Sequence, residues 1–239
     1  MTSPGQSPYD SRFFATLSGG VNRSARACVP LIVRHLNPRS ALDVGCGQGD
    51  WLRALLDAGV TDVLGVDGGH VRRDELRIPP DCFRAHDLAH PLAAGRRFDV
   101  ALCLEVAEHL PAESAADLVR SLTAAAPAVV FSAAVPGQGG VHHVNEQWPW
   151  YWQNLFDEHR YRCLDVFRKE LWQNPEVEAY YQQNLLLFVD PAVHGALLDA
   201  HPHALDNRLT LVQTYILKRP QRTGPWHRRL LQYVRGNGR

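Results

Sequence analysis

The chain reads Leu42-Asp43-Val44-Gly45-Cys46-Gly47-Gln48-Gly49-Asp50 at the point that decides its fold. The apolar residues before Gly45 predict a buried strand, and Asp50 begins a predicted helix. The alternate glycines between them let the backbone turn tightly and let a ligand approach the N-terminus of that helix. This strand, turn and helix predict an α/β fold that binds its ligand at the carboxyl ends of the strands.

Apolar runs alternate with helical patterns on both sides of this turn. We expect five strands, at 40–44, 63–66, 82–85, 98–104 and 128–134. We expect helices between them at 50–58, 71–76 and 111–125. Continuous apolar strands separated by helices are typical of a parallel sheet that is covered on both faces.

The two ends of the chain are less regular. A helix is predicted over residues 11–36, with Gly19-Gly20 as a break. After a glycine-rich loop near residue 140, we expect an aromatic helix at 147–159 and β segments at 162–168 and 185–189. The chain therefore divides into an N-terminal helical cap, one α/β domain and a basic tail whose composition is typical of disorder, at 1–38, 39–219 and 220–239.

Composition argues against several classes of protein. The 25 basic and 25 acidic side chains cancel, whereas nucleic-acid and membrane-surface proteins normally carry a basic excess. The five scattered cysteines form no C-x-x-C pair, so we expect neither a disulfide framework nor a thiolate zinc site. No run approaches the roughly 20 apolar residues that span a bilayer, and the polar first 14 residues lack the apolar segment of a secretory signal. We expect a cytoplasmic protein without a membrane partner.

Aspartates stand at the carboxyl ends of three predicted strands: Asp43 lies inside the end of the first, Asp67 ends the second and Asp87 follows the third. Asp67 can accept hydrogen bonds from both hydroxyls of a ribose, and Asp87 can accept one from the amine of an adenine. A single aspartate of this kind is usually a helix cap or turn residue, but three beside a glycine turn favour ligand binding. Asp50 replaces the last glycine of the G-x-G-x-x-G pattern, and its carboxylate would repel a pyrophosphate. An NAD(P)-binding oxidoreductase is therefore the weaker alternative.

In their order and spacing, these pieces resemble the class I S-adenosylmethionine-dependent methyltransferases. The resemblance spans about residues 40–135 and rests on residues 42–49, Val66-Asp67, His86-Asp87-Leu88 and the stretch 98–110, which contains Leu104-Glu105-Val106-Ala107-Glu108-His109-Leu110. It implies a Rossmann-like three-layer αβα sandwich whose seven-stranded sheet is mostly parallel, with the last strand antiparallel. It also implies S-adenosylmethionine as the cofactor.

The resemblance further implies which residues hold this cofactor. The glycine turn would lie against its methionine portion, Asp67 against the ribose, and Asp87 with Leu88 against the adenine. Arg23 of the N-terminal helix is the candidate partner of its carboxylate. The complete cofactor set is Asp43, Gly45, Cys46, Gly47, Gly49, Asp67, Gly68, Asp87, Leu88, Leu104 and Arg23.

Methyl transfer to a hydroxyl also requires a base near the transferred methyl group. One cluster that could supply it is Glu105-x-x-Glu108-His109, whose side chains would share one face of a helical turn. Carboxylates and imidazoles also bind divalent metals, and the pattern is similar to that of metal-using small-molecule and RNA 2′-O-methyltransferases. Metal-free members look alike here, so a divalent metal is an alternative that we do not favour. Its candidate ligands are Glu105, Glu108, His109 and His143.

A second cluster follows the fifth predicted strand, at 141–152, and combines histidines with three tryptophans. It offers a base, polar groups and an aromatic wall for an acceptor, although buried tryptophans of a core helix would give the same pattern. We predict His143 as the base, with His109 or His142 as alternates and Glu105 as a further catalytic candidate. The predicted substrate contacts are His142, Asn145, Glu146 and Trp148.

The sequence thus predicts an enzyme that methylates a hydroxyl or amine of a small molecule. The stretches 141–152 and 177–189 resemble a subgroup of bacterial methyltransferases that act on sugars and specialised metabolites. An RNA methyltransferase remains open because the segment after Lys218 carries several arginines, but the zero net charge makes nucleic acid the weaker partner. A nucleotide-binding domain that has lost catalysis is the third alternative. The acceptor and the oligomeric state are left open.

Overall fold

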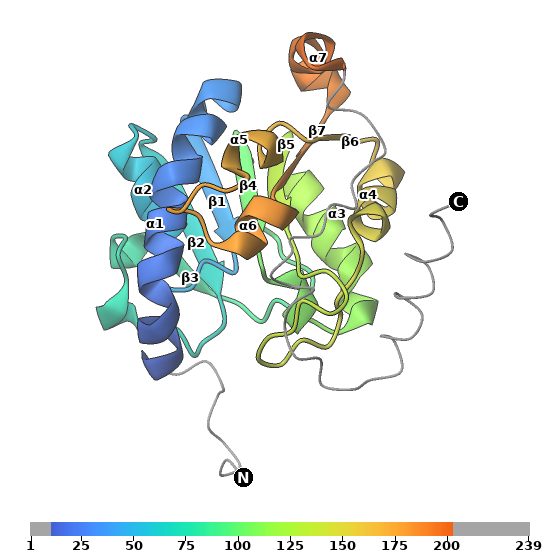
Figure 1. Cartoon of the computed structure of the whole chain (residues 1–239). Helices are drawn as coiled ribbons and strands as arrows, with labels where there is room; N and C mark the ends of the chain where they lie inside the picture. The colour runs from blue at the N-terminus through green and yellow to red at the C-terminus, as the bar shows by residue number, and fades with distance from the viewer. Residues whose placement is uncertain (1–10, 203–239) are drawn as a thin grey trace.

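The computed structural model describes residues 11–202 of the chain, with side chains from residue 19 onward. Within these residues the chain forms a seven-stranded sheet of order β3-β2-β1-β4-β5-β7-β6 (Figure 1). The strands are β1 (Ser40–Val44), β2 (Asp62–Asp67), β3 (Phe83–Ala85), β4 (Val100–Leu104), β5 (Ala128–Ser132), β6 (Arg162–Leu164) and β7 (Leu186–Val189). The first five strands pair in parallel, and β7 pairs antiparallel with both β5 and β6. The predicted sheet is confirmed.

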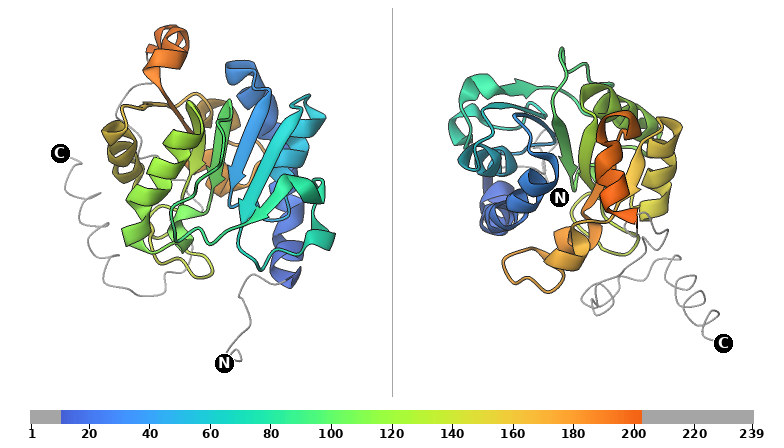
Figure 2. Two further views of the ribbon diagram at one scale, coloured as in Figure 1. Left: turned by 180° about the vertical axis from the view of Figure 1, so that it is seen from behind. Right: turned by 90° about the horizontal axis from the view of Figure 1, so that it is seen from above.

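Helices cover both faces of this sheet (Figure 2). One face packs against α1 (Ser11–Leu36), α2 (Asp50–Asp57), α5 (Arg168–Leu171) and α6 (Ala179–Asn184), and the other against α3 (Ala115–Ala125) and α4 (Pro149–Glu158). Because successive side chains of a strand point to opposite faces, Leu102 enters the first core and Cys103 the second. The central strands are buried on both sides, which explains why they read as continuous apolar runs.

Shorter elements complete the fold. Four 3-10 turns, η1 (Arg73–Glu75), η2 (Pro80–Cys82), η3 (Ala107–His109) and η4 (Ala112–Ser114), lie in the connections of the described chain. The final described helix, α7 (Pro191–Ala200), has no buried residue and extends above the sheet in Figure 1. Between residues 11 and 202, no helix combines the length and apolar character needed to cross a bilayer. The predicted tail, 220–239, lies outside the described residues.

The predicted break at Gly19-Gly20 is wrong, because α1 continues through both glycines. Gly20 packs closely against the loop before α6. A Cβ atom on Gly20 would lie 2.3 Å from Oε1 of Glu178, so a larger residue there would displace this side chain. Glu178 also lies 3.5 Å from the guanidinium of Arg23. Gly20 therefore lets α1 approach a segment that is distant in the sequence.

Two other predicted elements are shorter than expected. The helix at 71–76 is only the η1 turn, and Pro79-Pro80 follow it closely. The β segment predicted at 162–168 ends at Leu164. Arg168, the last residue of the predicted segment, instead begins α5. It is buried and donates hydrogen bonds of 3.0 and 2.6 Å to the carboxylate of Asp165. This local ion pair turns the chain away from the sheet.

Candidate active site

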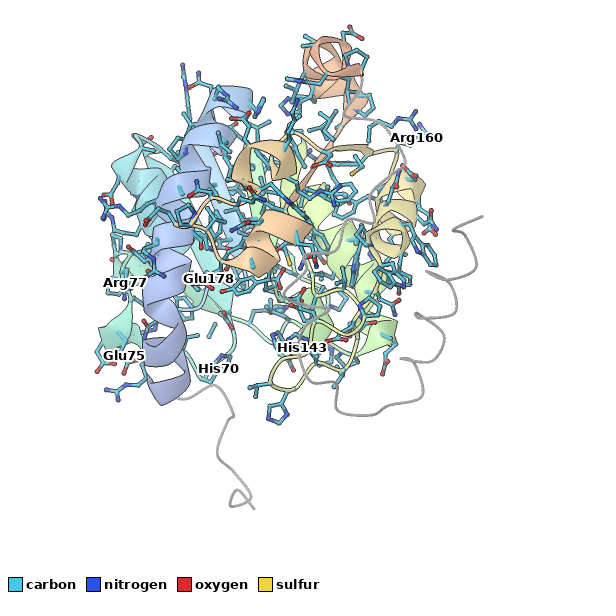
Figure 3. All side chains as sticks on the ribbon, viewed as in Figure 1. His70, Glu75, Arg77, His143, Arg160 and Glu178 are labelled. Atoms are coloured by element: carbon cyan, nitrogen blue, oxygen red, sulfur yellow. The ribbon has the colours of Figure 1, made fainter. Side chains whose placement is uncertain are left out.

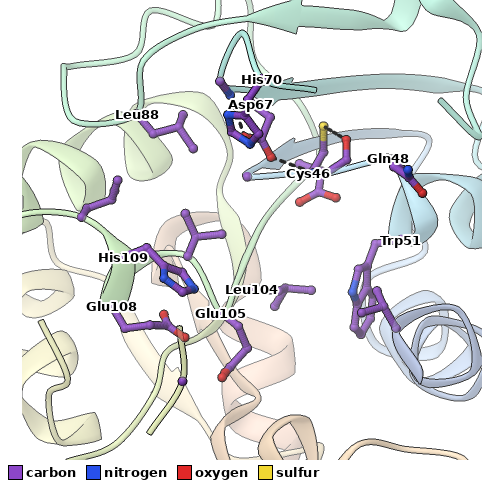
Figure 4. Close-up of a pocket in the computed structure, with 18 of the residues that line it drawn as sticks. Cys46, Gln48, Trp51, Asp67, His70, Leu88, Leu104, Glu105, Glu108 and His109 are labelled. Carbon is purple, nitrogen blue, oxygen red and sulfur yellow. Dashed lines mark hydrogen bonds and ion pairs between the residues drawn. The ribbon is translucent and has the colours of Figure 1, made fainter. Parts of the chain in front are cut away.

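A cavity of about 990 Å³ lies at the carboxyl ends of β1, β2, β3 and β4. The strand order reverses between β1 and β4, and open α/β sheets bind their ligands beside such a reversal. Figure 4 shows Asp67 and His70 on one side of this cavity and Glu105, Glu108 and His109 on the other. His70 and His143, which both line it, lie at the lower end of the molecule in Figure 3. The cavity is where the glycine turn predicted a ligand.

The glycine turn forms one wall of the cavity, and its backbone requires glycine. Gly45 has φ +86°, and a Cβ atom there would lie 2.2 Å from Cγ2 of Val106. Gly49, with φ +87°, is the residue before α2. Residues with a side chain rarely adopt these backbone dihedral angles. The turn thus presents bare backbone to the cavity at the N-terminus of a helix.

Asp67, at the end of β2, holds the turn in place. Its Oδ2 accepts a hydrogen bond from the N–H of Gly47 at 2.7 Å, and its Oδ1 accepts one from Gly68 at 2.6 Å. His70 Nε2 lies 3.6 Å from Oδ1. Burial raises the pKa of Asp67, although the two backbone hydrogen bonds oppose this shift. A carboxylate has about four acceptor positions, so Asp67 can also accept hydrogen bonds from a ligand.

Asp43 is a buried carboxyl group at the floor of the cavity. Its side chain is 2% exposed, and Oδ2 has no hydrogen-bond partner among the described residues. Burial, with the charges of Asp67 and Asp50, raises its pKa to about 8. An isolated buried carboxylate is costly unless a cation or donor compensates it. Asp43 therefore suits a positively charged ligand.

Asp50, which departs from the dinucleotide pattern, is neutralised by the protein itself. Arg77 Nε lies 3.0 Å from its Oδ1, and the amide of Asn22 donates a hydrogen bond of 3.1 Å to the same atom. Burial raises the pKa of Asp50, and the contacts with Asn22 and Arg77 oppose the shift. The carboxylate of Asp50, whose charge would repel a pyrophosphate, thus also ties α2 to α1 and to the loop after η1.

The predicted contacts of the adenine line the cavity, whereas the predicted partner of the cofactor's carboxylate does not. Asp87 and Leu88 both line the cavity, but the carboxylate of Asp87 is 70% exposed and accepts the N–H of Ala89 at 3.0 Å. Asp87 is therefore also a turn residue. Arg23 is not among the lining residues and lies beside Glu178 instead, whereas Val21 of the same helix does line the cavity. Gly49 does not line the cavity either, whereas the remaining predicted cofactor residues, Cys46 and Leu104 among them, do.

On the other side of the cavity, Glu105 is held by two amides. Gln138 Nε2 donates to its Oε2 at 2.8 Å, and Asn184 Nδ2 donates to its Oε1 at 3.1 Å. Asn184 also donates to Oε1 of Gln138 at 2.8 Å. Burial raises the pKa of Glu105, and the two amides oppose the shift. The residue has φ +55°, an unfavourable conformation for glutamate, so its orientation is fixed at the expense of backbone strain.

Glu108, His109 and His143 form a compact cluster. The rings of His109 and His143 meet edge to face, with centroids 4.8 Å apart. One ligand atom from each of the three residues lies within 4.8 Å of the others. Glu108 is fully buried, and burial and the charge of Glu105 raise its pKa well above the usual value. Burial and His143 lower the pKa of His109 to about 4, so this imidazole is neutral near pH 7. Three of the four predicted metal ligands thus come together.

The four predicted substrate contacts do not line the cavity. His142 is exposed, with φ +57°. Asn145 is buried, and its amide bonds with the carbonyl of Ala107 at 3.4 Å and with Gln147 at 2.9 Å. Glu146 binds His143 instead of facing the cavity, and Trp148 lies just before α4. The loop does reach the site, but through His143 and the backbone beside it.

The expected aromatic wall is not formed, because none of the three tryptophans lines the cavity. Trp152 is 2% exposed and packs against Phe131, with ring centroids 5.2 Å apart. Trp150 is 53% exposed and does not line the cavity. The alternative interpretation of the stretch, in which buried tryptophans anchor a helix, holds for Trp152 but not for Trp150.

Several lining residues were not predicted, namely Val21, Trp51, His70, Gln138, Tyr180 and Tyr181. Trp51 directly follows the glycine turn. Its place in the first turn of a helix that faces a ligand could have identified it. Gln138 carries no motif, and Tyr181 lies in the stretch 177–189, whose resemblance gave it no role in the site. They reach the cavity only because α6 and the loop after β5 fold back over the sheet.

Comparisons with known proteins agree with this geometry. A family model described as a methyltransferase domain matches residues 20–174. The structure of a methyltransferase domain of bacterial CtHen1 superposes with a TM-score of 0.51 at 17% identity, covering 71% of this chain and 99% of that one. A putative O-methyltransferase from Nostoc punctiforme gives a TM-score of 0.54 at 14% identity, covering 74% of this chain and 58% of its own. None of the curated proteins compared with the sequence is a significant match. At these identities the structures establish a shared fold.

Proposed function

Because the chain belongs to the methyltransferase domain family, we propose that it transfers the methyl group of S-adenosylmethionine to a hydroxyl or amine of a small molecule. The observation that carries this proposal is Asp43, a buried carboxylate whose Oδ2 is unpartnered within residues 11–202 and faces a glycine-lined cavity. The cofactor carries positive charge on its sulfonium and its ammonium group. Either charge would compensate this carboxylate.

The remaining cofactor residues fit the same molecule. The bare backbone around Gly45 accommodates its methionine portion, since a side chain there would meet Val106. Asp67 retains acceptor capacity for the two ribose hydroxyls. Asp87 and Leu88, which line the cavity, are the proposed contacts of the adenine. We assign no cofactor contact to Arg23, which is engaged with Glu178.

When bound, the cofactor supplies an electrophilic methyl group on a positively charged sulfur. The task of the protein is to align the acceptor, to exclude water and to take up one proton. His143 lines the acceptor side of the cavity and is the proposed base, in position to accept the proton that the nucleophile loses. The fixed carboxylate of Glu105 would orient the acceptor through a hydrogen bond.

The composition of the lining favours an acceptor without phosphate groups. Among the described residues the cavity carries six carboxyl side chains and neither lysine nor arginine; these are Asp43, Asp50, Asp67, Asp87, Glu105 and Glu108. Phosphates are normally bound by cationic side chains, and RNA binding depends on them. Hydroxyl- or amine-bearing molecules, such as sugars and specialised metabolites of bacterial type, match this lining better than RNA does.

Metal-assisted transfer is the second candidate, and the cluster of Glu108, His109 and His143 favours it. A carboxylate and two imidazoles are suitable donors for a divalent cation, and the low pKa of His109 keeps this imidazole in the neutral form that binds metals. Such a cation would polarise an acceptor hydroxyl. Loss of transfer on adding a chelator, with recovery on adding Mg²⁺ or Mn²⁺, would support this candidate over the first.

Calorimetric titration tests the proposal. The purified protein is titrated with S-adenosylmethionine, S-adenosylhomocysteine and NAD, with and without a chelator. We expect micromolar binding of the two sulfur compounds, none of NAD, and no effect of the chelator on either affinity. Binding of NAD alone would favour an oxidoreductase. Failure of all three to bind would indicate a domain that has lost its cofactor.

A further inference from the structure

The loop after β5 is organised around the carboxylate of Glu146. Its Oε2 accepts a hydrogen bond from the N–H of Gly137 at 2.8 Å, and its Oε1 accepts one from Gly139 at 2.9 Å. Nδ1 of His143 lies 2.9 Å from the same Oε1. Glu146 does not line the cavity, whereas Gly139 and His143 do. One carboxylate therefore fixes both the backbone of the loop and the ring that the loop carries.

The proton positions follow from these contacts. The two backbone N–H groups can only donate, so both oxygens of Glu146 act as acceptors. Each oxygen is thus already occupied by a backbone donor, as in an ionised carboxylate, which cannot donate a hydrogen bond. The proton of the hydrogen bond must therefore lie on Nδ1 of His143.

We propose that Glu146 is a positioning residue, which holds His143 in the tautomer with a proton on Nδ1 and a free lone pair on Nε2. This inference rests on the proposed function, in which His143 is the base. It assigns to Glu146 a role through His143 instead of contact with the acceptor. A carboxylate behind an imidazole fixes both the orientation of the ring and the nitrogen that is available for chemistry.

The opposite side of the ring is shaped by Gly140. A Cβ atom on this residue would lie 2.1 Å from Nε2 of His143 and 2.4 Å from its Cε1. Both residues line the cavity. Glu146 holds one edge of the ring, and the missing side chain of Gly140 leaves room for the other edge. The ring of His143 is therefore held between the carboxylate of Glu146 and the backbone of Gly140.

In the proposed step the proton on the acceptor oxygen or nitrogen passes to Nε2 of His143. The lone pair of the acceptor forms the new bond to the methyl carbon, and the electron pair of the broken carbon–sulfur bond stays on sulfur. His143 becomes an imidazolium ion with protons on both nitrogens. Its Nδ1–H then forms a charge-assisted hydrogen bond with Glu146, which is stronger than the neutral one.

The tautomer can be measured directly, without an acceptor. Long-range ¹H–¹⁵N spectra of protein labelled with ¹⁵N-histidine distinguish a protonated from an unprotonated ring nitrogen. His143→Gln identifies the signals of His143 among the twelve histidines. At about pH 8.5, two units above the ordinary histidine pKa, we expect the proton on Nδ1 in the wild type. Glu146→Ala should move part or all of it to Nε2, whereas Glu113→Gln, at an exposed glutamate, should have no effect.

Two outcomes would overturn the inference. One is a wild-type His143 that carries its proton on Nε2. The other is an unchanged tautomer in Glu146→Ala, with circular dichroism showing that the variant is folded. Glu146→Asp, which keeps the charge but shortens the side chain, should restore part of the Nδ1–H population. Titration with S-adenosylhomocysteine tests the proposed function separately, because loss of that binding would remove the methyltransferase proposal and leave the tautomer result standing.

Discussion

The indole N–H of Trp51 donates a hydrogen bond to the hydroxyl of Tyr181 at 3.3 Å, and the two rings meet edge to face with centroids 5.1 Å apart. Trp51 lies in the first turn of α2, directly after the glycine turn, and Tyr181 lies in α6. Both side chains are buried and line the cavity. This contact therefore joins the cofactor side of the cavity to a segment 130 residues further along the chain.

Tyr181→Phe should weaken both the fold and the cofactor site. The change leaves the buried indole N–H of Trp51 without its acceptor, which typically costs about 1–3 kcal/mol. We expect a lower free energy of unfolding in urea and a weaker affinity for S-adenosylhomocysteine. Tyr161→Phe is the matched control, because that buried hydroxyl donates to the carbonyls of Thr123 and Ala126 away from the cavity. Tyr161→Phe should lose stability and keep its affinity for S-adenosylhomocysteine. Equal affinities for both variants would contradict a link between the Trp51–Tyr181 contact and the cofactor site.

Cofactor binding should release a proton from Asp43. Its pKa in the folded protein is about 8, against an ordinary value of 3.8. Between these values the folded state holds a proton that the unfolded state has lost, so the contribution of Asp43 to stability falls as the pH rises from about 4 to 8. A cationic ligand favours the ionised carboxylate. Affinity for S-adenosylmethionine should therefore increase with pH up to about 8.

Calorimetry in two buffers with different ionisation enthalpies measures that proton. At pH 7 we expect net proton release in the wild type and a smaller release in Asp43→Asn. The variant should also bind S-adenosylmethionine about tenfold or more weakly, the loss expected for a charge-assisted hydrogen bond of about 1.5–3 kcal/mol. Identical proton release in the two proteins would show that Asp43 does not contact the cofactor's positive charge.

Gly45→Ala should be far more damaging than Gly59→Ala. Both glycines have positive φ, at +86° and +98°, so both alanine variants carry the strain of a left-handed backbone, about 1–2 kcal/mol. Only at Gly45 would the new Cβ meet another side chain, that of Val106, whereas nothing lies within 4 Å of the corresponding position at Gly59. Urea unfolding of both variants isolates this contact. Similar losses of stability would mean that Val106 moves aside at little cost.

The features that the sequence predicts well are those encoded by neighbouring residues. The glycine turn and the strand β1 follow from local pattern, and the strand begins and ends where expected. The break at Gly19-Gly20 was wrong because α1 continues through both glycines, and the residue that packs against Gly20, Glu178, lies in a distant segment. The part played by Glu146 was missed for a related reason. Its three donors become visible only when the loop is folded, whereas in sequence it is one polar residue among several.

The acceptor half of the site was harder to predict than the cofactor half. Asp43 and Asp67 end consecutive strands of a parallel sheet, so topology alone brings them together. The partners of Glu105, by contrast, are Gln138 and Asn184, which come from a loop and a short helix without a motif. Such pairings depend on how irregular segments pack, and local propensity does not encode that.

His143→Ala should lower turnover by about two orders of magnitude, the usual contribution of a general base, and leave the affinity for S-adenosylmethionine unchanged. The reason is that His143 lies on the acceptor side, away from Asp43 and the glycine turn. Turnover is measured with an acceptor found by screening sugars, amino sugars and related polyols. Glu108→Gln separates the two proposed mechanisms, since it removes a metal ligand but leaves the histidine base and Glu146 intact. Loss of activity in both variants, together with inhibition by a chelator, would favour the metal. Loss confined to His143→Ala, with no effect of the chelator, would favour the base.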